Sequence, residues 1–306
     1  MKTGTKKRFF VFMVFLLAAV FASAGAATAA PSNIYISDDA GKKVVSTDVT
    51  YDTLAVNNQQ AGALTGVQVN NGGKLNVTGV ASFDRTATTG DTVGIAVSSG
   101  GAVNLVGKQY VYDGVTGVWV TGGKALASGD IYVYTGATGV SVDSGTMDVK
   151  KVFTYGENTV GVAVGEDGKV TTANIQTEEG STGVKSAGTL EINGNVTAKT
   201  LSTGVEVTGG ETTVTGSVGV EDAETYGMKA TGGKVMVGGV SINMGGGIGI
   251  ESSVDLTLSQ DVNVQHSGTG LRIVGGTATV SGRVRTSASS QKQAIGVEAI
   301  SGKVTV

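Results

Sequence analysis

The chain has 306 residues, a formal net charge of −3 at neutral pH and no cysteine, and 50 of its residues are glycine. The missing cysteine excludes disulfide cross-links and thiolate zinc sites, and the missing Gly-X-Y period excludes collagen. Abundant Val, Thr and Gly with few charged residues indicate an all-β protein of short strands and tight turns.

The first expected element is a signal peptide over residues 1–29. Four basic residues stand among the first eight positions, residues 9–20 are apolar, and Ala27-Thr28-Ala29 fits the small-residue rule for cleavage. Cleavage after Ala24 is a second option, and an uncleaved membrane anchor is the alternative interpretation. We expect export by the Sec route, with periplasmic passage, to the cell surface, the outer membrane or the medium.

The chain that follows is acidic. Removal of residues 1–29 leaves 18 basic and 25 acidic residues, a formal net charge of −7. Such a surface does not attract nucleic acid or anionic membranes, so we expect no nucleic-acid partner. Without disulfides, backbone pairing and core burial must supply the stability.

Residues 30–65 are expected to form an N-terminal cap and a first irregular coil. Three apolar pairs mark the expected strands: Ile34/Ile36, Val44/Val45 and Leu54/Val56. A bare first coil would expose unpaired backbone groups at its edge, which is why a cap is expected here.

A glycine followed by an aliphatic residue recurs throughout residues 66–306. It occurs at Gly66, Gly94, Gly117, Gly139, Gly161, Gly183, Gly204, Gly227, Gly249, Gly270 and Gly296, with most intervals close to 22 residues. A fixed period of this length is typical of stacked structural repeats. Helical solenoids would need a 3.6-residue periodicity, which is missing, and propeller blades would need about 40 residues.

Each repeat contains three short alternations of apolar and polar residues separated by turns. Expected inward pairs include Val67/Val69, Val140/Val142 and Val205/Val207 in the first strand, Leu75/Val77 in the second and Ile131/Val133 in the third. Such strands are too short to be stable alone. Stacked in parallel about 4.8 Å apart, they bury their apolar faces in continuous columns. We predict a parallel β-helix of three sheets with about 22 residues per coil and about 11 coils.

The end of the chain falls within a coil. Residues 301–306 make up one and a half strands of a new coil, and a bare terminal coil invites aggregation. We therefore expect a longer natural protein or a truncated product, and favour truncation.

The repeated phrase TGVxVxxGGxxxVxG over residues 66–306, preceded by an export signal, resembles the passenger region of bacterial autotransporters. The resemblance implies a right-handed parallel β-helix, exported through a C-terminal outer-membrane barrel and often active in adhesion or aggregation. The repeats contain no segments of barrel type. The resemblance therefore implies that the barrel lies downstream in a full-length parent.

Candidate catalytic residues are few. His266 is the sole histidine and lies at a strand end, which argues against a Ser-His-Asp site. A polysaccharide lyase or hydrolase would use acidic groups, for which the candidates are Asp38-Asp39, Glu178-Glu179 and Glu221-Asp222-Glu224. These lie in the cap or in turns and are interpreted as solvated charges. We expect no enzymatic activity, no cofactor and no metal site, with a carbohydrate-active enzyme as the alternative.

Aromatic residues are concentrated in one part of the chain: eight of the 11 that follow the signal lie between residues 83 and 155. Strand alternation turns outward Tyr110, Tyr112, Trp119, Tyr132 and Tyr134, whereas Phe153 and Tyr155 fit either direction. These five outward residues form a possible binding surface.

Two interpretations of this aromatic surface remain open. It could be an external stack that stabilises the early coils. It could also be an amphipathic platform for host or bacterial surface glycans or proteins. We expect an adhesive or structural rod displayed at the cell surface, with a pure stalk for a missing downstream domain as a further alternative.

Overall fold

The computed structural model describes residues 32–86, 89–222, 224–243, 246–288 and 293–306, so the expected signal peptide at 1–29 lies outside the described residues. The residues from Ser32 to Val306 form one compact unit. Their regular secondary structure is β-strand apart from one short 3-10 helix, and no helix among the described residues has the length and apolarity of a membrane span.

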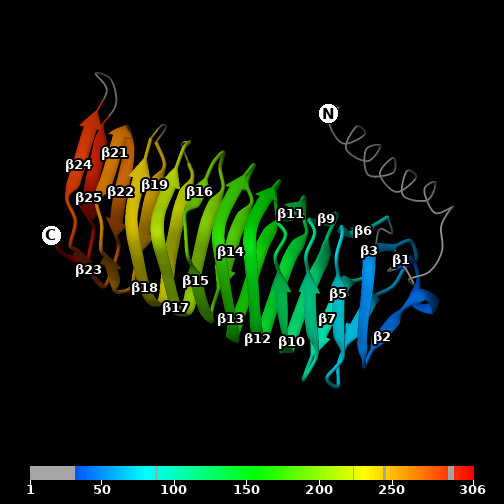
Figure 1. The fold of residues 1–306 in the computed structure, drawn as a ribbon. Coiled ribbons are helices and arrows are strands. Elements are labelled where there is room, and N and C mark those ends of the chain that lie inside the picture. Colours follow the sequence, from blue (N-terminus) through cyan, green and yellow to red (C-terminus); the bar gives the residue numbers. More distant parts are fainter. Residues whose placement is uncertain (1–31, 87–88, 223, 244–245, 289–292) are drawn as a thin grey trace. The chain divides into compact units, whose positions relative to one another are not determined.

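The strands follow one another along the chain with short connections (Figure 1). One 3-10 turn, η1 (Asp39–Gly41), accompanies the strands β1 (Ser32–Ile36), β2 (Lys43–Val45), β3 (Asp48–Asn58), β4 (Leu64–Val69), β5 (Lys74–Val77), β6 (Ala81–Arg85), β7 (Thr92–Ser98), β8 (Ala102–Leu105), β9 (Gln109–Val111), β10 (Val115–Ala127), β11 (Ile131–Tyr134), β12 (Thr138–Tyr155), β13 (Val160–Glu178), β14 (Thr182–Ser186), β15 (Thr189–Ile192), β16 (Val196–Ala198), β17 (Thr203–Val220), β18 (Tyr226–Ile242), β19 (Ile248–Ser252), β20 (Leu256–Leu258), β21 (Val262–His266), β22 (Gly268–Ile273), β23 (Thr277–Val280), β24 (Val284–Ala288), β25 (Ala294–Ala299) and β26 (Lys303–Thr305).

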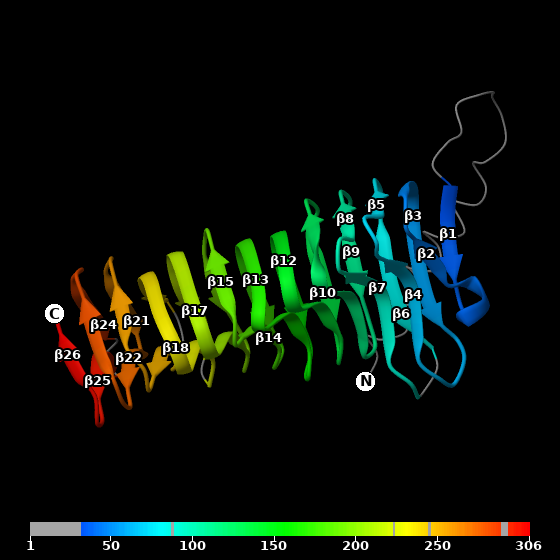
Figure 2. The same ribbon diagram turned by 90° about the horizontal axis from the view of Figure 1, so that it is seen from below.

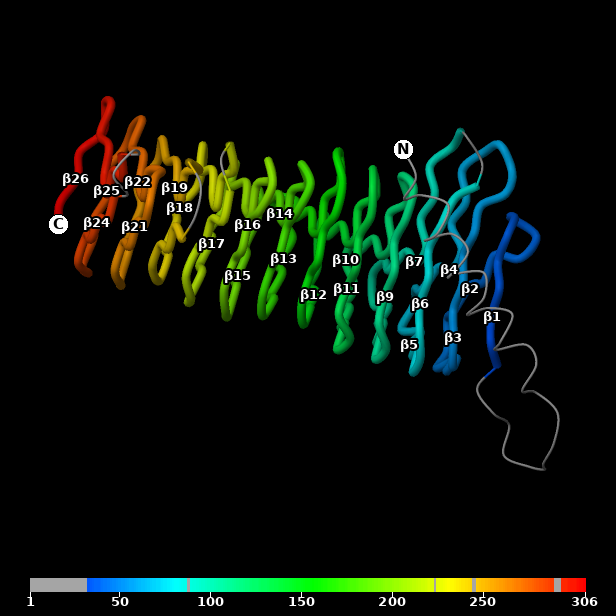
Figure 3. Tube along the Cα trace, turned by 90° about the horizontal axis from the view of Figure 1, so that it is seen from above, coloured from blue at the N-terminus to red at the C-terminus, as the bar shows by residue number. Residues whose placement is uncertain are grey.

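The strands build a parallel β-solenoid in which each coil contributes to three sheets. Register partners one coil apart are Val118, Val140 and Val162 in the first sheet, Ala125, Met147 and Val170 in the second, and Ile131, Val152 and Ile175 in the third. These partners are 22 residues apart, or 21 and 23 in places, and the strands that carry them pair in parallel. Consecutive coils lie side by side in chain order in all three views (Figure 1, Figure 2, Figure 3). The predicted β-helix is confirmed.

The core consists of continuous columns of inward side chains. In the first sheet one column runs through Val67, Ile95, Val118, Val140, Val162, Val184, Val205, Met228, Ile250, Leu271 and Val297. The members from Val67 to Leu271 are buried to 0 % exposure. The predicted inward pairs of the second and third strands are buried in the same way, so alternation alone identified the core.

The segment expected to cap the repeats contributes to the solenoid itself. Strand β2 pairs in parallel with β4, and β3 pairs with both β5 and β6. Strand β1 continues the third sheet by pairing with β3. The three apolar pairs predicted as strands lie in β1, β2 and β3. The described chain therefore has about 12 coils, one more than the glycine positions indicated.

The recurrent glycines are required by the close approach of adjacent coils. A Cβ at Gly139 would lie 2.6 Å from the carbonyl oxygen of Gly161, and a Cβ at Gly161 would lie 2.5 Å from that of Gly183. Neither glycine has a positive φ, unlike the turn glycine Gly72 at 82°. The repeat therefore uses glycine for two separate reasons, space between coils and turn conformation.

Candidate functional site

The outer face of the third sheet carries six aromatic side chains in two columns, which we call the aromatic ladder. Tyr110, Tyr132 and Phe153 form one column, with ring centroids 5.4 and 4.9 Å apart. Tyr112, Tyr134 and Tyr155 form the other, with centroids 4.9 and 5.4 Å apart. Within a column the ring planes deviate by 7–18°, so each ring stacks on its neighbour in the next coil.

Strand alternation positions these rings. In β11 the buried Ile131 and Val133 alternate with Tyr132 and Tyr134, which are half-buried and point outward. Phe153 and Tyr155, for which both directions were open, lie opposite Tyr132 and Tyr134 and point outward as well. Parallel pairing at strand spacing then brings identical positions of neighbouring coils into ring contact.

The ladder presents ring edges and hydroxyl groups more than ring faces. Tyr132 lies between Tyr110 and Phe153, and Tyr134 lies between Tyr112 and Tyr155, so the central rings have neighbours on both faces. A sugar or an aromatic ligand stacks on an open ring face. This geometry favours the stabilising stack over the binding platform.

Stacking also changes the acidity of the phenols. Burial, followed by the neighbouring phenols, raises the pKa of Tyr134 to about 12. Burial likewise raises the pKa of Tyr112, helped by Tyr134 and Tyr110, and that of Tyr155, helped by Glu178. Each of these tyrosines therefore stays neutral at a pH above the ordinary tyrosine pKa of about 10.

We expect the ladder to weaken in alkali. A raised folded-state pKa means that the native state prefers the neutral phenol. The contribution of Tyr134 to the free energy of unfolding is therefore intact below pH 10 and is lost as the pH rises through about 12. Tyrosinate absorbance in a pH titration should show a late-ionising group of tyrosines. Tyr134→Phe should reduce its amplitude while retaining the fold. Titration of all eight tyrosines in one step near 10 would contradict the stacked geometry.

Trp119 is not part of the ladder. It lies in β10 on the first sheet, opposite Ala96 and Ser141, with 38 % of its surface exposed. Its indole Nε1 donates a hydrogen bond of 2.8 Å to Asp143 Oδ2. The structure therefore brings together four of the five predicted binding residues and places the tryptophan on a different sheet.

Four of the seven acidic candidates for catalysis, Asp38, Glu178, Glu221 and Asp222, make structural contacts. Lys199 Nζ lies 2.9 Å from Glu221 and 3.9 Å from Glu178, so the two glutamates flank one lysine. The hydrogen bond to Glu221 raises the pKa of Lys199. The side chain of Asp38 accepts a hydrogen bond from the Gly41 amide in η1. The prediction of purely solvated charges therefore needs correction at Glu178 and Glu221, which belong to an ion-pair column.

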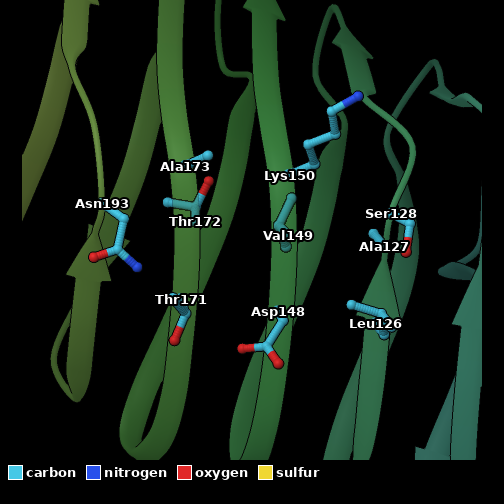
Figure 4. Close-up of a pocket in the computed structure, with 10 residues that line it drawn as sticks. All are labelled: Leu126, Ala127, Ser128, Asp148, Val149, Lys150, Thr171, Thr172, Ala173 and Asn193. Carbon is cyan, nitrogen blue, oxygen red and sulfur yellow. The ribbon is translucent and has the colours of Figure 1, made fainter.

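The chain also has an open hollow of about 390 Å³ beside the second sheet. Its lining residues come from four neighbouring coils, in or directly after β10, β12, β13 and β15, and include the exposed Leu126, Asp148 and Lys150 (Figure 4). Asp148 is the one carboxylate in this lining, whereas glycoside hydrolysis uses two.

One surface feature was not predicted from the sequence. The outward column of the first sheet carries a charge ladder of strictly alternating sign, formed by Lys185, Glu206, Lys229, Glu251, Arg272 and Glu298. The ion-pair distances are 3.7 Å for Lys185–Glu206, 3.9 Å for Lys229–Glu251, 3.5 Å for Arg272–Glu251 and 2.8 Å for Arg272–Glu298. The signal was available as one charge after each Gly-aliphatic pair from residue 183 onward.

Exchanging two charges should test what the charge ladder contributes. The double variant Glu206→Lys/Lys229→Glu keeps the composition but places like charges opposite one another at two steps of the column. We expect a loss of about 1 kcal/mol, because exposed pairs contribute little each, and a smaller loss at high salt. Thermal melting at two salt concentrations measures it. Inverting all six charges restores alternation and should melt like the original; equal losses in both variants would show that alternation is irrelevant.

The comparisons with known proteins assign no family. No protein-family model matches the chain, and no match is found among curated proteins or solved structures. The fold and its surfaces define a parallel β-solenoid with an aromatic ladder, a charge ladder and one anchored tryptophan.

Proposed function

We propose that this chain is the exported passenger region of an autotransporter-like protein, a non-catalytic rod displayed at the cell surface with an adhesive or structural role. The observation that carries the proposal is the unbroken stack of coils with aliphatic inward columns. Such a solenoid repeats its surface positions at a fixed interval, which suits presentation of contacts along a length. The signal-peptide pattern of residues 1–29 supports export.

The contacts made by four of the acidic candidates support a non-catalytic role. Besides the pairing of Glu178 and Glu221 with Lys199, the carboxylate of Asp222 accepts hydrogen bonds from the amide and the hydroxyl of Thr200. Carboxylates held in this way form ion pairs with, and accept hydrogen bonds from, groups of neighbouring coils and turns. A general acid or base would need a proton-transfer partner in a substrate site.

Export can be tested with a reporter. Residues 1–306 fused to a β-lactamase that lacks its own leader should confer ampicillin resistance on a Gram-negative host. The matched fusion that begins at residue 32 should remain inside the cell and confer none. Resistance from both fusions, or from neither despite equal expression, would contradict the proposal.

The role of the aromatic ladder separates adhesive from structural function. Residues 32–306 would be displayed on cells through a heterologous outer-membrane anchor, with Tyr110, Tyr112, Tyr132 and Tyr134 replaced by serine in the variant. We expect a lower melting temperature of the purified variant and unchanged adhesion to epithelial cells, because the rings stabilise one another. Thr257→Ser/Thr279→Ser, on exposed positions of the second sheet, is the matched control. Lost adhesion at unchanged stability would instead make the ladder the binding surface.

A further inference from the structure

Trp119 is held by a hydrogen bond to the next coil and lies outside the stacked columns of the aromatic ladder. The indole donates to Asp143 Oδ2 at 2.8 Å, and Asp143 Oδ1 in turn accepts from Ser141 Oγ at 3.1 Å. Ser141 and Asp143 belong to the coil that follows the coil of Trp119. Two adjacent coils therefore fix an exposed indole, which removes much of the conformational entropy that a free surface side chain would lose on binding.

The surroundings of Trp119 leave room for a ligand. Its register neighbours along the column are Ala96 on one side and Ser141 on the other, followed by Ala163 one coil beyond. A methyl and a hydroxymethyl group are too small to cover both faces of an indole. Nε1 reaches toward the Asp143 coil, and the register partner on the other side, Ala96, offers only a methyl group.

The charge of the surface around Trp119 limits the class of ligand. The outward column of the first sheet reads Val44, Gln68, Ala96, Trp119, Ser141 and Ala163 before the charge ladder begins at Lys185. This half of the column is uncharged, and the carboxylate of Asp143 lies beside the indole. A sulfated, sialylated or uronic ligand would meet that carboxylate and no compensating cation in this half of the column.

We propose that Trp119 and Asp143 form a contact site for a neutral saccharide. The apolar face of a pyranose ring would stack on the indole, as amphipathic aromatic side chains allow. The carboxylate oxygens of Asp143 would accept hydrogen bonds from sugar hydroxyls with the lone pairs that Ser141 and the indole leave open. This inference rests on the proposed adhesive function and names its class of ligand. The site lies on the first sheet and does not include the aromatic ladder.

The experiment uses the fact that the chain has one tryptophan. Purified residues 32–306 would be titrated with cellohexaose, N-acetylchitohexaose and the anionic hexamer of galacturonate, with tryptophan fluorescence as the readout. We expect a saturable change with at least one neutral hexamer, with a dissociation constant on the order of 1 mM or below, and none with hexagalacturonate.

Variants locate the site. Asp143→Ala keeps the fluorophore and should weaken binding about tenfold, because the indole loses its anchor and the sugar loses an acceptor. Trp119→Ala, assayed by saturation-transfer NMR after its melting temperature is checked, should abolish binding. Tyr132→Ser/Tyr134→Ser, on the third sheet, should bind like the original.

Each outcome decides the inference. No saturable change with either neutral hexamer, or binding that survives Trp119→Ala in a folded variant, overturns it. Tighter binding of hexagalacturonate than of the neutral hexamers overturns the ligand class. If no saccharide binds but the reporter is exported, the saccharide site is contradicted and the proposed rod function stands. If a neutral saccharide binds but the reporter is not exported, the proposed function is contradicted and the saccharide site stands.

Discussion

Replacing Gly161 by alanine is expected to destabilise the solenoid by about 3 kcal/mol. The added Cβ would lie 2.5 Å from the carbonyl oxygen of Gly183 and 2.5 Å from Val152 Cγ1. The carbonyl belongs to the backbone of the next coil, which the parallel ladder holds in place. Relief therefore requires two neighbouring strands of the first sheet to move apart, and a rotamer change cannot provide it. Chemical denaturation of the purified protein measures the loss.

Gly219→Ala is the matched control for this experiment. Gly219 lies in β17, and a Cβ there would lie 3.6 Å from the Val196 carbonyl oxygen and 3.7 Å from that of Ser241, which are ordinary contacts. Its φ is not positive, so alanine should be neutral or slightly stabilising by restricting the unfolded chain. Equal losses at Gly161 and Gly219 would mean that the close approach of coils does not explain the recurrent glycine.

The repeat predicted the fold because each coil must satisfy the same geometry. Alternation in a strand has a period of two, so the residues between apolar positions are assigned to the outside without further knowledge. The period then specifies which residues are neighbours, as the column from Val67 to Val205 shows. The reason for the recurrent glycine could not be read in this way, since close approach of two coils depends on coordinates.

The surfaces were less predictable than the core. The sequence placed Tyr132 and Trp119 both outside but could not show that the tyrosine is stacked on both faces while the indole is tied to Asp143. It left Phe153 and Tyr155 open because counting back from the following glycine assumes a constant strand length. Connections of variable length between sheets shift that count, and pairing with β11 decides the register instead.

The charge ladder helps to specify which coils pair with one another, which the aliphatic columns alone do not. Coils with nearly identical inward residues would bury the same apolar groups if a coil paired with its second neighbour. On the outer face such a slip would place Lys185 against Lys229, and Glu206 against Glu251. Like charges directly opposite one another destabilise a sheet, so alternation favours the correct order of coils.

The two phenylalanines among the described residues, Phe83 and Phe153, should respond very differently to truncation. Phe83 is buried to 0 % exposure in β6, and its ring fills the space beside Gly94, where a Cβ would lie 2.5 Å from Phe83 Cε1. Phe83→Ala would leave a cavity bounded by glycines that cannot fill it. We expect a loss of about 3–5 kcal/mol.

Phe153→Ala removes the same atoms from the outer face. Phe153 is half-buried and stacks on Tyr132 with centroids 4.9 Å apart, so we expect a loss of about 1 kcal/mol. Urea denaturation of both variants and the original protein gives the comparison. A loss for Phe153→Ala as large as that for Phe83→Ala would place the ring in the core and reverse the register of β12. The pair therefore tests the inward and outward assignment on which the aromatic ladder, and its separation from Trp119, depends.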